Sequence, residues 1–349
     1  MGLTTIQKLR RAASQIRNRF RPGVLILLYH RIVETPSDPY LLNVTPQHFK
    51  EHLEILRKQG CTVMHLQELT QALQDGTLPH RAVVVTFDDG YVDNLCNAKP
   101  LLEHHEIPAT VFVTSGYVGQ DREFWWDELD RLLLQPGTLP KTLDLKIQGK
   151  TFEWVLDDDA YYNKEHQQCD RSWHLYQQHD PTQRHQVFRS LHHQLNALPF
   201  NARWPILHEL AEWAGTEVSS RPTHRLLSAN ELVELAKGDL IHIGAHTVSH
   251  PVLSALPVSA QKEEIWQSKV DLENILDRPV VAFAYPHGAR SDYTQDTVRL
   301  VKAAGFICAC SNFPEMVWQN SDYFQLPRIL IYDWNGEKFE KELKKWIKS

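Results

Sequence analysis

The chain has 349 residues, of which 42% are hydrophobic and 23% are charged. This ordinary globular composition excludes a disordered or fibrous chain. The formal net charge of −6 gives the protein no overall basic character, so we expect no nucleic-acid partner. Its five cysteines are scattered and odd in number, which favours a reducing compartment over a disulfide framework.

The first 22 residues differ from the rest in charge. Residues 1–21 hold six Lys or Arg and no acid, and their apolar residues recur at steps of three and four. This predicts a basic amphipathic N-terminal segment over 1–22, suited to an anionic membrane surface. The alternative is that its apolar stripe packs on the protein while the cations are solvated. The sequence shows no secretory signal and no apolar run that could span a bilayer, so we expect a cytoplasmic protein, peripheral on the inner membrane face if the segment binds lipid.

From residue 24 onward, short apolar runs alternate with segments of helical period. The runs are largely β-branched or aromatic and mostly continuous, which is typical of parallel strands covered on both faces. The expected strands are 24–28, 62–64, 82–87, 109–113, 240–244, 280–284, 306–309 and 328–331. The expected helices are 46–58, 66–75, 92–105, 229–237, 259–276, 294–304 and 336–348. About seven strand–helix repeats predict a wound α/β fold, most simply a (β/α) barrel.

The repeat breaks between about residues 121 and 225. This stretch holds six of the ten tryptophans and shows helical segments but no buried strands of parallel type. We interpret 121–225 as a largely helical insertion in one βα loop, which assigns 23–120 and 226–335 to the barrel and 336–349 to a C-terminal helix. Because βα loops open onto the catalytic face of a barrel, the insertion is expected to overhang that face.

Two adjacent carboxylates follow the strand expected at 82–87. Asp88 and Asp89 precede Gly90, and this sequence is also typical of a turn or of a helix cap. Barrel strands end at the catalytic face, however, so two acids at this point are placed for metal binding and proton transfer.

A pair of histidines follows the strand expected at 240–244. His246 and His250 are four residues apart, and on one face of a helical turn they could chelate one ion. Such a pair is weak evidence in a chain with 19 histidines, but its position at a strand end places it near the two aspartates. Two imidazoles and one carboxylate are the protein ligands of a catalytic zinc site with an open water position.

A third strand end has the sequence Phe-Ala-Tyr285-Pro-His287-Gly. Taken alone, it is typical of a rigid turn. Together and in this order, the three strand ends resemble the polysaccharide deacetylase family, the NodB-homology domain of carbohydrate esterase family four. The resemblance covers 23–120 and 226–335 but not the insertion, and it implies a distorted (β/α) barrel of about seven strands.

The resemblance also implies roles for individual residues. It implies Asp88 as the general base and Asp89, His246 and His250 as ligands of one divalent metal ion, for which zinc is the first choice; cobalt, nickel or iron suit similar ligands. It further implies that the backbone N–H of Tyr91 helps to hold the oxyanion.

Two departures from the family pattern concern the base and the acid. Ala284 stands where many members carry an Arg that orients the base, which places this chain closest to the branch with Phe-Ala-Tyr-Pro-x-Gly. His287 is the last histidine, so the downstream Leu-x-His box that supplies the acid in many members is absent. His30, which follows the first strand, is our candidate for the acid, with a structural histidine as the alternative and His287 as the second candidate. Asp333-Trp334 resembles the family's Asp-Trp motif, and its role is left open.

The predicted function is metal-dependent hydrolysis of the N-acetyl group of an amino sugar in a polysaccharide, oligosaccharide or lipid-linked glycan. The alternatives are a deformylase or related amide hydrolase acting on a lipid-linked aminosugar, and a catalytically silent carbohydrate-binding module. The candidate substrate-binding residues are Tyr91, Trp126, Tyr285 and His287. Trp126 lies in a Phe-Trp-Trp-Asp run that either faces sugar rings or forms the core of the insertion.

Adjacent histidines elsewhere are not expected to bind metal. His104-His105 and His192-His193 lie on helical patterns, where neighbouring side chains diverge. We therefore expect no second metal site in the insertion.

Overall fold

The computed structural model describes residues 23–217 and 219–347. The basic segment predicted over residues 1–22 lies outside these residues, so its contact with a membrane stays a prediction, as does the cytoplasmic location. Within the described ranges, no helix combines the length and the apolar content that a membrane crossing requires.

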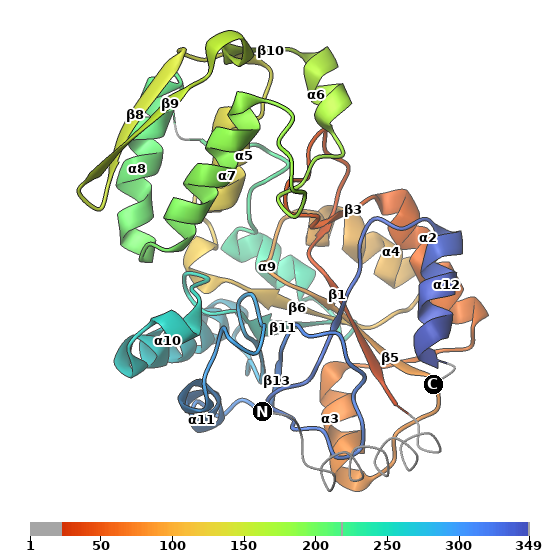
Figure 1. The fold of residues 1–349 in the computed structure, drawn as a ribbon. Coiled ribbons are helices and arrows are strands. Elements are labelled where there is room, and N and C mark those ends of the chain that lie inside the picture. Colours follow the sequence, from red (N-terminus) through yellow and green to blue (C-terminus); the bar gives the residue numbers. More distant parts are fainter. Residues whose placement is uncertain (1–22, 218, 348–349) are drawn as a thin grey trace, which may run out of the picture.

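A curled parallel sheet forms the centre of the molecule (Figure 1). Its strands are β1 (Leu25–Tyr29), β5 (Ala82–Phe87), β6 (Ala109–Val113), β11 (Ile241–Ala245), β12 (Ala282–Ala284), β13 (Cys308–Cys310) and β14 (Ile329–Leu330). They pair in the order β13–β12–β11–β6–β5–β1–β14, and the short β4 (Thr62–Val63) pairs with the start of β5. Each of these pairs is parallel.

The two edges of this sheet are linked through residues 326–330. The Leu326 N–H donates to the carbonyl of Ala309 (2.9 Å), and the Ser311 N–H donates to the carbonyl of Leu326 (2.8 Å). A few residues later the same segment becomes β14 and pairs with β1. The predicted distorted (β/α) barrel of about seven strands, with an insertion in one βα loop, is thus confirmed.

Alternate residues of the strands belong to two hydrophobic clusters. Leu27 and Tyr29 of β1 pack with the outer helices, whereas Ile26 belongs to a smaller cluster inside the barrel. Leu69 of α3 (Leu66–Asp75) joins this inner cluster, so α3 closes the end of the barrel opposite the insertion (Figure 1). Burial on both faces explains why the strands are continuously apolar in sequence.

The outer helices match the periods in the sequence closely. They are α2 (Pro46–Lys58), α4 (Lys99–His104), α9 (Ala229–Leu235), α10 (Val258–Leu276), α11 (Gln295–Ala303) and α12 (Gly336–Ile347). The helix expected at 92–105 is instead a π-helical turn (Asn94–Ala98) that runs into α4. Short elements near the strand ends are β2 (Arg31–Ile32), β3 (Asn43–Val44) and the 3-10 turns Ser115–Tyr117 and Leu253–Ala255.

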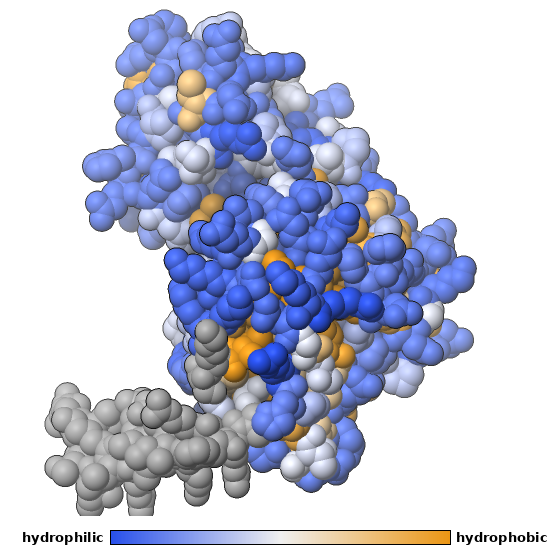
Figure 2. Space-filling model, turned by 90° about the vertical axis from the view of Figure 1, so that its right-hand side faces the viewer, coloured by the Kyte–Doolittle hydropathy of each residue, from blue (hydrophilic) through white to orange (hydrophobic). Residues whose placement is uncertain are grey.

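Residues 121–225 form a separate layer above the barrel (Figure 1). Its helices are α5 (Trp125–Leu133), α6 (Lys164–Asp170), α7 (Gln183–Asn196) and α8 (Phe200–Trp213), and a 3-10 turn spans Asp157–Ala160. Its strands are β7 (Gly137–Thr138), β8 (Thr142–Ile147), β9 (Lys150–Val155) and β10 (Tyr161–Tyr162). Buried residues of this layer form a second hydrophobic cluster, which also includes Tyr91, Tyr117 and Leu226 of the barrel. In the space-filling view, hydrophilic residues dominate the visible face and apolar ones form small patches (Figure 2).

The antiparallel hairpin β8–β9 is a feature that the sequence analysis did not predict. Its signal was present, because buried and exposed residues alternate along β8, with Leu143, Leu145 and Ile147 buried. Gln148 and Gly149 form the turn with φ of 50° and 80°, the left-handed backbone that a tight hairpin turn favours. This two-residue alternation is typical of a half-buried strand and differs from the continuous apolar runs that predicted the parallel strands.

Candidate active site

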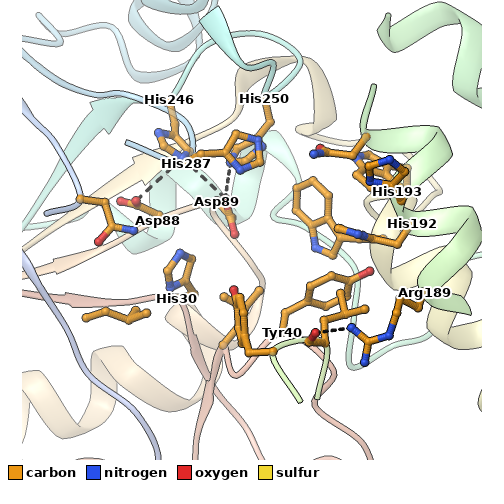
Figure 3. Close-up of a pocket in the computed structure, with 18 residues that line it drawn as sticks. His30, Tyr40, Asp88, Asp89, Arg189, His192, His193, His246, His250 and His287 are labelled. Carbon is orange, nitrogen blue, oxygen red and sulfur yellow. Dashed lines mark hydrogen bonds and ion pairs between the residues drawn. The ribbon is translucent and has the colours of Figure 1, made fainter. Parts of the chain in front are cut away.

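A cavity of about 540 Å³ lies between the barrel and the insertion (Figure 3). The barrel contributes His30, Asp88, Asp89, His246, His250, His287, Asn312 and Leu330. The loop before β3 contributes Tyr40 and Leu42, and the insertion contributes Trp125, Trp126, Leu175, Tyr176, Arg189, His192, His193 and Asn196. The insertion therefore overhangs the site, as predicted.

Asp89, His246 and His250 come together at the barrel side of this cavity. The Nε2 atoms of His246 and His250 lie 3.7 and 3.5 Å from Oδ1 of Asp89. All three residues are buried, and their ligand atoms lie within 4.8 Å of one another. The structure thus unites the three residues predicted to bind metal, from the ends of two strands that neighbour β6 on either side.

An irregular turn, rather than a helix, joins His246 to His250. Thr247 and His250 have φ of 64° and 57°, and the His250 N–H donates to Oγ1 of Thr247 (3.1 Å). Glu264 of α10 accepts the N–H groups of Val248 and Ser249, each at 2.9 Å. The prediction that His246 and His250 lie on a helical turn is therefore wrong, although the two histidines do come together beside Asp89. The left-handed residues persist because the surrounding hydrogen bonds determine the backbone.

The ring of His246 is oriented for ligation. Its Nδ1 lies 2.8 Å from the carbonyl oxygen of Ala284, which can only accept, so Nδ1 carries the proton. Nε2 therefore presents its lone pair to Asp89. Burial lowers the pKa of His246 below its usual value despite the nearby charge of Asp88, which keeps the ring neutral, as a ligand requires.

Asp89 supplies an observation that fits a bound cation. Its Oδ1 atom is buried and finds no hydrogen-bond partner among the described residues. Burial and the charges of Asp88 and Asp127 raise the pKa of Asp89 well above its usual value, and the charges of Arg31 and Arg328 offset this only in part. A buried carboxylate oxygen beside two imidazole nitrogens is a donor set suited to zinc. The residues present therefore fit a divalent ion.

Asp88 is held by a residue that the sequence analysis missed. Nη1 and Nη2 of Arg328 each donate to one oxygen of Asp88 at 2.7 Å. Arg328 is buried, and its Nε donates to the carbonyl of Ser311 (2.9 Å). Burial raises the pKa of Asp88, but opposing effects, with the charge and hydrogen bonds of Arg328 foremost, leave the pKa below its usual value. Asp88 is thus held ionised.

Arg328 lies just before β14, on the strand expected at 328–331. Ala284 stands at the position where the family pattern has an Arg that orients the base, and no local motif in the sequence supplies a replacement. The one sequence signal for Arg328 is that a charged residue stands at the start of an expected buried strand. The pairing itself joins residues 240 positions apart, which no local pattern reveals.

The two candidate acids both line the cavity. His30 follows β1, and its Nδ1 is buried with no partner in the described part of the chain. Burial lowers the pKa of His30 to about 4 and that of His287 also to about 4. The ring of His287 lies 4.8 Å from that of His250. Both histidines are therefore neutral near pH 7 in the free protein.

The predicted substrate-binding residues separate into two groups. Trp126 and His287 line the cavity, and the ring of Trp126 lies 5.0 Å from that of His250. The side chain of Tyr91 lies instead beneath the site, where its hydroxyl donates to Asp127 (2.6 Å) and accepts from Nε1 of Trp126 (3.1 Å). Trp126 also belongs to the core of the insertion, as one interpretation of its sequence run predicts, and its contact with a sugar stays a prediction.

Tyr285 points away from the site. Tyr285 does not line the cavity. Its ring stacks on Tyr293 with centroids 4.1 Å apart, and its hydroxyl donates to the carbonyl of Phe324 (2.9 Å). The structure therefore does not place the Tyr285 side chain for substrate contact, because this residue packs in the hydrophobic cluster between the strands and the outer helices.

Asp333 and Trp334 also serve the fold. Asp333 accepts the backbone N–H of Thr45 (2.9 Å) and lies 2.6 Å from Nδ1 of His48. Nε2 of His52 donates to the carbonyl of Trp334 (2.6 Å). These contacts anchor α2 beside the end of β14.

A family model described as Polysaccharide deacetylase matches residues 75–139 and 208–308 of this chain. The poly-beta-1,6-N-acetyl-D-glucosamine N-deacetylase of Staphylococcus aureus is 30% identical over 304 residues, which cover 87% of this chain and 72% of that protein. The putative polysaccharide deacetylase YxkH of Bacillus subtilis is 30% identical over 129 residues, 36% of this chain. That match spans 45% of the length of YxkH.

Two solved structures share the fold along nearly their whole length. The Streptococcus pyogenes deacetylase PplD, solved in complex with acetate, matches with a TM-score of 0.56 and 18% identity over 93% of this chain and 99% of PplD. IcaB from Ammonifex degensii matches with a TM-score of 0.56 and 18% identity over 94% of this chain and 98% of IcaB. At these identities the likeness is one of fold.

Proposed function

Since the chain belongs to the polysaccharide deacetylase family, we propose that it hydrolyses the acetamide of an N-acetylated amino sugar in a glycan. The observation that carries this proposal is that one cavity brings together the Asp89–His246–His250 cluster and the carboxylate of Asp88, which Arg328 holds. The name of the Staphylococcus aureus relative favours a poly-N-acetylglucosamine chain, or an oligomer of it, as the substrate.

The proposed cofactor is one divalent ion, zinc by its donor set, held by Asp89, His246 and His250. When bound, such an ion supplies Lewis acidity, which makes water a better nucleophile and the acetyl carbonyl a better electrophile. The unpartnered Oδ1 of Asp89 and the outward lone pair of His246 Nε2 support this assignment.

Asp88 is the proposed general base. It takes a proton from water as the water oxygen forms a bond to the acetyl carbon. Arg328 uses one hydrogen bond on each carboxylate oxygen, which fixes the plane of the carboxylate and leaves further lone pairs for that proton. Because Arg328 also keeps the pKa of Asp88 low, the base is ionised before substrate binds.

The backbone N–H of Tyr91 is the proposed donor to the developing oxyanion. The neighbouring groups pair across the chain: the Leu227 N–H donates to the Gly90 carbonyl (3.2 Å), and the Val92 N–H donates to the Arg225 carbonyl (3.1 Å). The Tyr91 N–H itself has no acceptor among the described residues. A fixed donor of this kind stabilises negative charge without reorganisation.

His30 is the proposed proton donor to the leaving amine when the C–N bond breaks and acetate departs. As a neutral histidine it must first receive a proton, and the proton that Asp88 takes from water is the available source. Asp88 and His30 line the same cavity, and the charge of Asp88 acts on His30. His287 remains the second candidate.

The proposal is tested with purified, zinc-loaded protein and N-acetylglucosamine oligomers. Acetate release that increases the number of free amines one for one supports it. Formate release from an N-formylated aminosugar without acetate release would identify a deformylase instead. Binding of oligomers with no release of either acid would indicate a silent carbohydrate-binding module.

A further inference from the structure

The cavity wall that faces the metal cluster is one side of α7. Four residues of this helix line the cavity at helical spacings of three and four: Arg189, His192, His193 and Asn196. Figure 3 shows Arg189, His192 and His193 across the cavity from His246, His250 and Asp89. The adjacent histidines therefore line the same cavity.

Tyr176 lies on the loop that precedes α7 and also lines this cavity. It is 73% exposed, the most exposed of the large hydrophobic side chains in the described chain. An aromatic ring that is left in water at the entrance of a pocket is available to a ligand.

The loop that carries Tyr176 is held rigidly. Arg189 donates to the carbonyls of Leu175 and Gln177, the residues on either side of Tyr176. The same guanidinium pairs with Asp180 at 2.7 Å, and the Leu175 N–H donates to the carbonyl of Pro39 on the barrel side (3.0 Å). The backbone is thus fixed, while the ring has one tilted contact with His174, at 5.9 Å between centroids, and otherwise lies in water. A fixed backbone lowers the entropy cost of ligand binding.

Two polar side chains of this wall are free to bind a ligand. His193 and Asn196 are exposed, and neither side chain has a hydrogen-bond partner among the described residues. Arg189 is already paired with Asp180, so this wall offers no free cation to an anionic ligand. His192 is occupied differently, because its ring stacks on Trp125 with centroids 5.3 Å apart.

We propose that Tyr176, His193 and Asn196 form a subsite for the sugar unit next to the one that is deacetylated. The inference rests on the proposed function. A pyranose ring has an apolar C–H face that can lie on the Tyr176 ring and hydroxyl groups that can bond to His193 and Asn196. The ligand of this subsite is an uncharged sugar in an oligosaccharide of at least two units. The cavity of about 540 Å³ exceeds what an acetamide group alone requires.

The test compares substrates of different length in the zinc-loaded Tyr176→Ala protein. The substrates are the monomer and the β-1,6-linked pentamer of N-acetylglucosamine, and a fluorogenic acetyl ester serves as a probe too small to reach the subsite. We expect KM for the pentamer to rise about five- to tenfold, as the loss of one aromatic contact predicts, with kcat and ester hydrolysis unchanged. Tyr176→Phe keeps the ring and is expected to keep the wild-type KM.

Tyr161→Ala is the matched control, because Tyr161 is 58% exposed on β10 of the same insertion but does not line the cavity. It should leave every parameter unchanged. The subsite is refuted if Tyr176→Ala does not alter the preference for the pentamer over the monomer, or if it lowers ester hydrolysis equally.

Pentamer binding is also measured by calorimetry in an Asp88→Asn background, in which hydrolysis is too slow to disturb the measurement. Weaker binding on addition of Tyr176→Ala supports the subsite, and unchanged binding refutes it. If wild-type protein binds the pentamer through Tyr176 but releases no acetate, the proposed function fails while the subsite stands.

Discussion

The two walls of the cavity are built in different ways. On the barrel wall, Asp88 is 3% exposed and is fixed by Arg328 through two bonds of 2.7 Å. On the insertion wall, Tyr176 is 73% exposed, and His193 has no side-chain partner among the described residues. Catalysis of hydrolysis requires charged groups that are held in fixed positions and shielded from water, whereas sugar recognition requires exposed polar and aromatic side chains. We therefore expect changes on the barrel wall to alter kcat and changes on the insertion wall to alter KM.

The largest effect is expected for Asp88→Asn. Loss of the general base should reduce kcat at least about a hundredfold. The zinc content should stay near that of the wild type, because Asp88 is not one of the three clustered ligands. Acetate release and elemental analysis of the same preparation measure both quantities.

His246→Ala is the contrasting variant, because it should lose metal and activity together. A near-normal rate in the Asp88→Asn protein would refute the proposed mechanism. Loss of zinc from it would instead place Asp88 among the ligands.

Arg328→Lys should have the next largest effect. Lysine cannot form two parallel bonds to a carboxylate, so kcat should fall about tenfold. Because Arg328 lowers the pKa of Asp88, its loss should raise that pKa, and activity at the acid end of the profile should disappear at a higher pH than in the wild type. The pH dependence of kcat/KM measures this shift, and an unchanged acid limb would contradict it.

Arg328→Ala should also destabilise the fold. It leaves the charge of Asp88 buried without its partner, which costs about 3–5 kcal/mol of unfolding free energy. The pKa of Asp88 is depressed in the folded state, so the stabilising effect of the pair exists at neutral pH and is lost as pH falls through the folded pKa. Urea denaturation at neutral pH and at about pH 3 should therefore show a smaller difference between variant and wild type in acid.

His30→Ala should lower kcat by a similar factor, about tenfold, which lies below the usual range for a sole general acid because His287 can take over part of the role. His30 must be neutral to receive the proton from Asp88, so activity of the wild type should be lost as pH falls through the pKa of His30, about 4, and the acid limb of the kcat/KM profile should move to lower pH in the variant. His287→Ala is the matched comparison and should keep the wild-type acid limb. The assignment is wrong if His30→Ala keeps both that limb and most of the rate.

His193→Ala should have the smallest effect. The loss of one hydrogen bond to a sugar hydroxyl should raise KM for the pentamer about threefold and leave kcat unchanged. A fall in kcat that exceeds the change in KM would mean that the insertion wall takes part in the chemistry, and the comparison of the two walls would fail.

Most of the barrel follows from local sequence. The helices expected at 46–58 and 66–75 have those bounds in the structure, and each expected strand overlaps an observed one. Local periodicity suffices here because each strand is buried on both faces and each outer helix on one. The residues at three strand ends also identified the family, and Asp88, Asp89, His246 and His250 meet because carboxyl ends of parallel strands share one edge.

Only the tertiary structure decided which side chains surround these four residues. Arg328 pairs with Asp88 from 240 positions along the chain and takes the place of the guanidinium that is absent at Ala284. Tyr285 turns into the core although it neighbours the site in sequence. Likewise, His192 and His193 diverge on α7 and yet both reach the cavity, because the insertion folds back over the barrel. Periodicity and motifs record contacts within a few residues, so partners brought together by chain topology leave no local trace in this sequence.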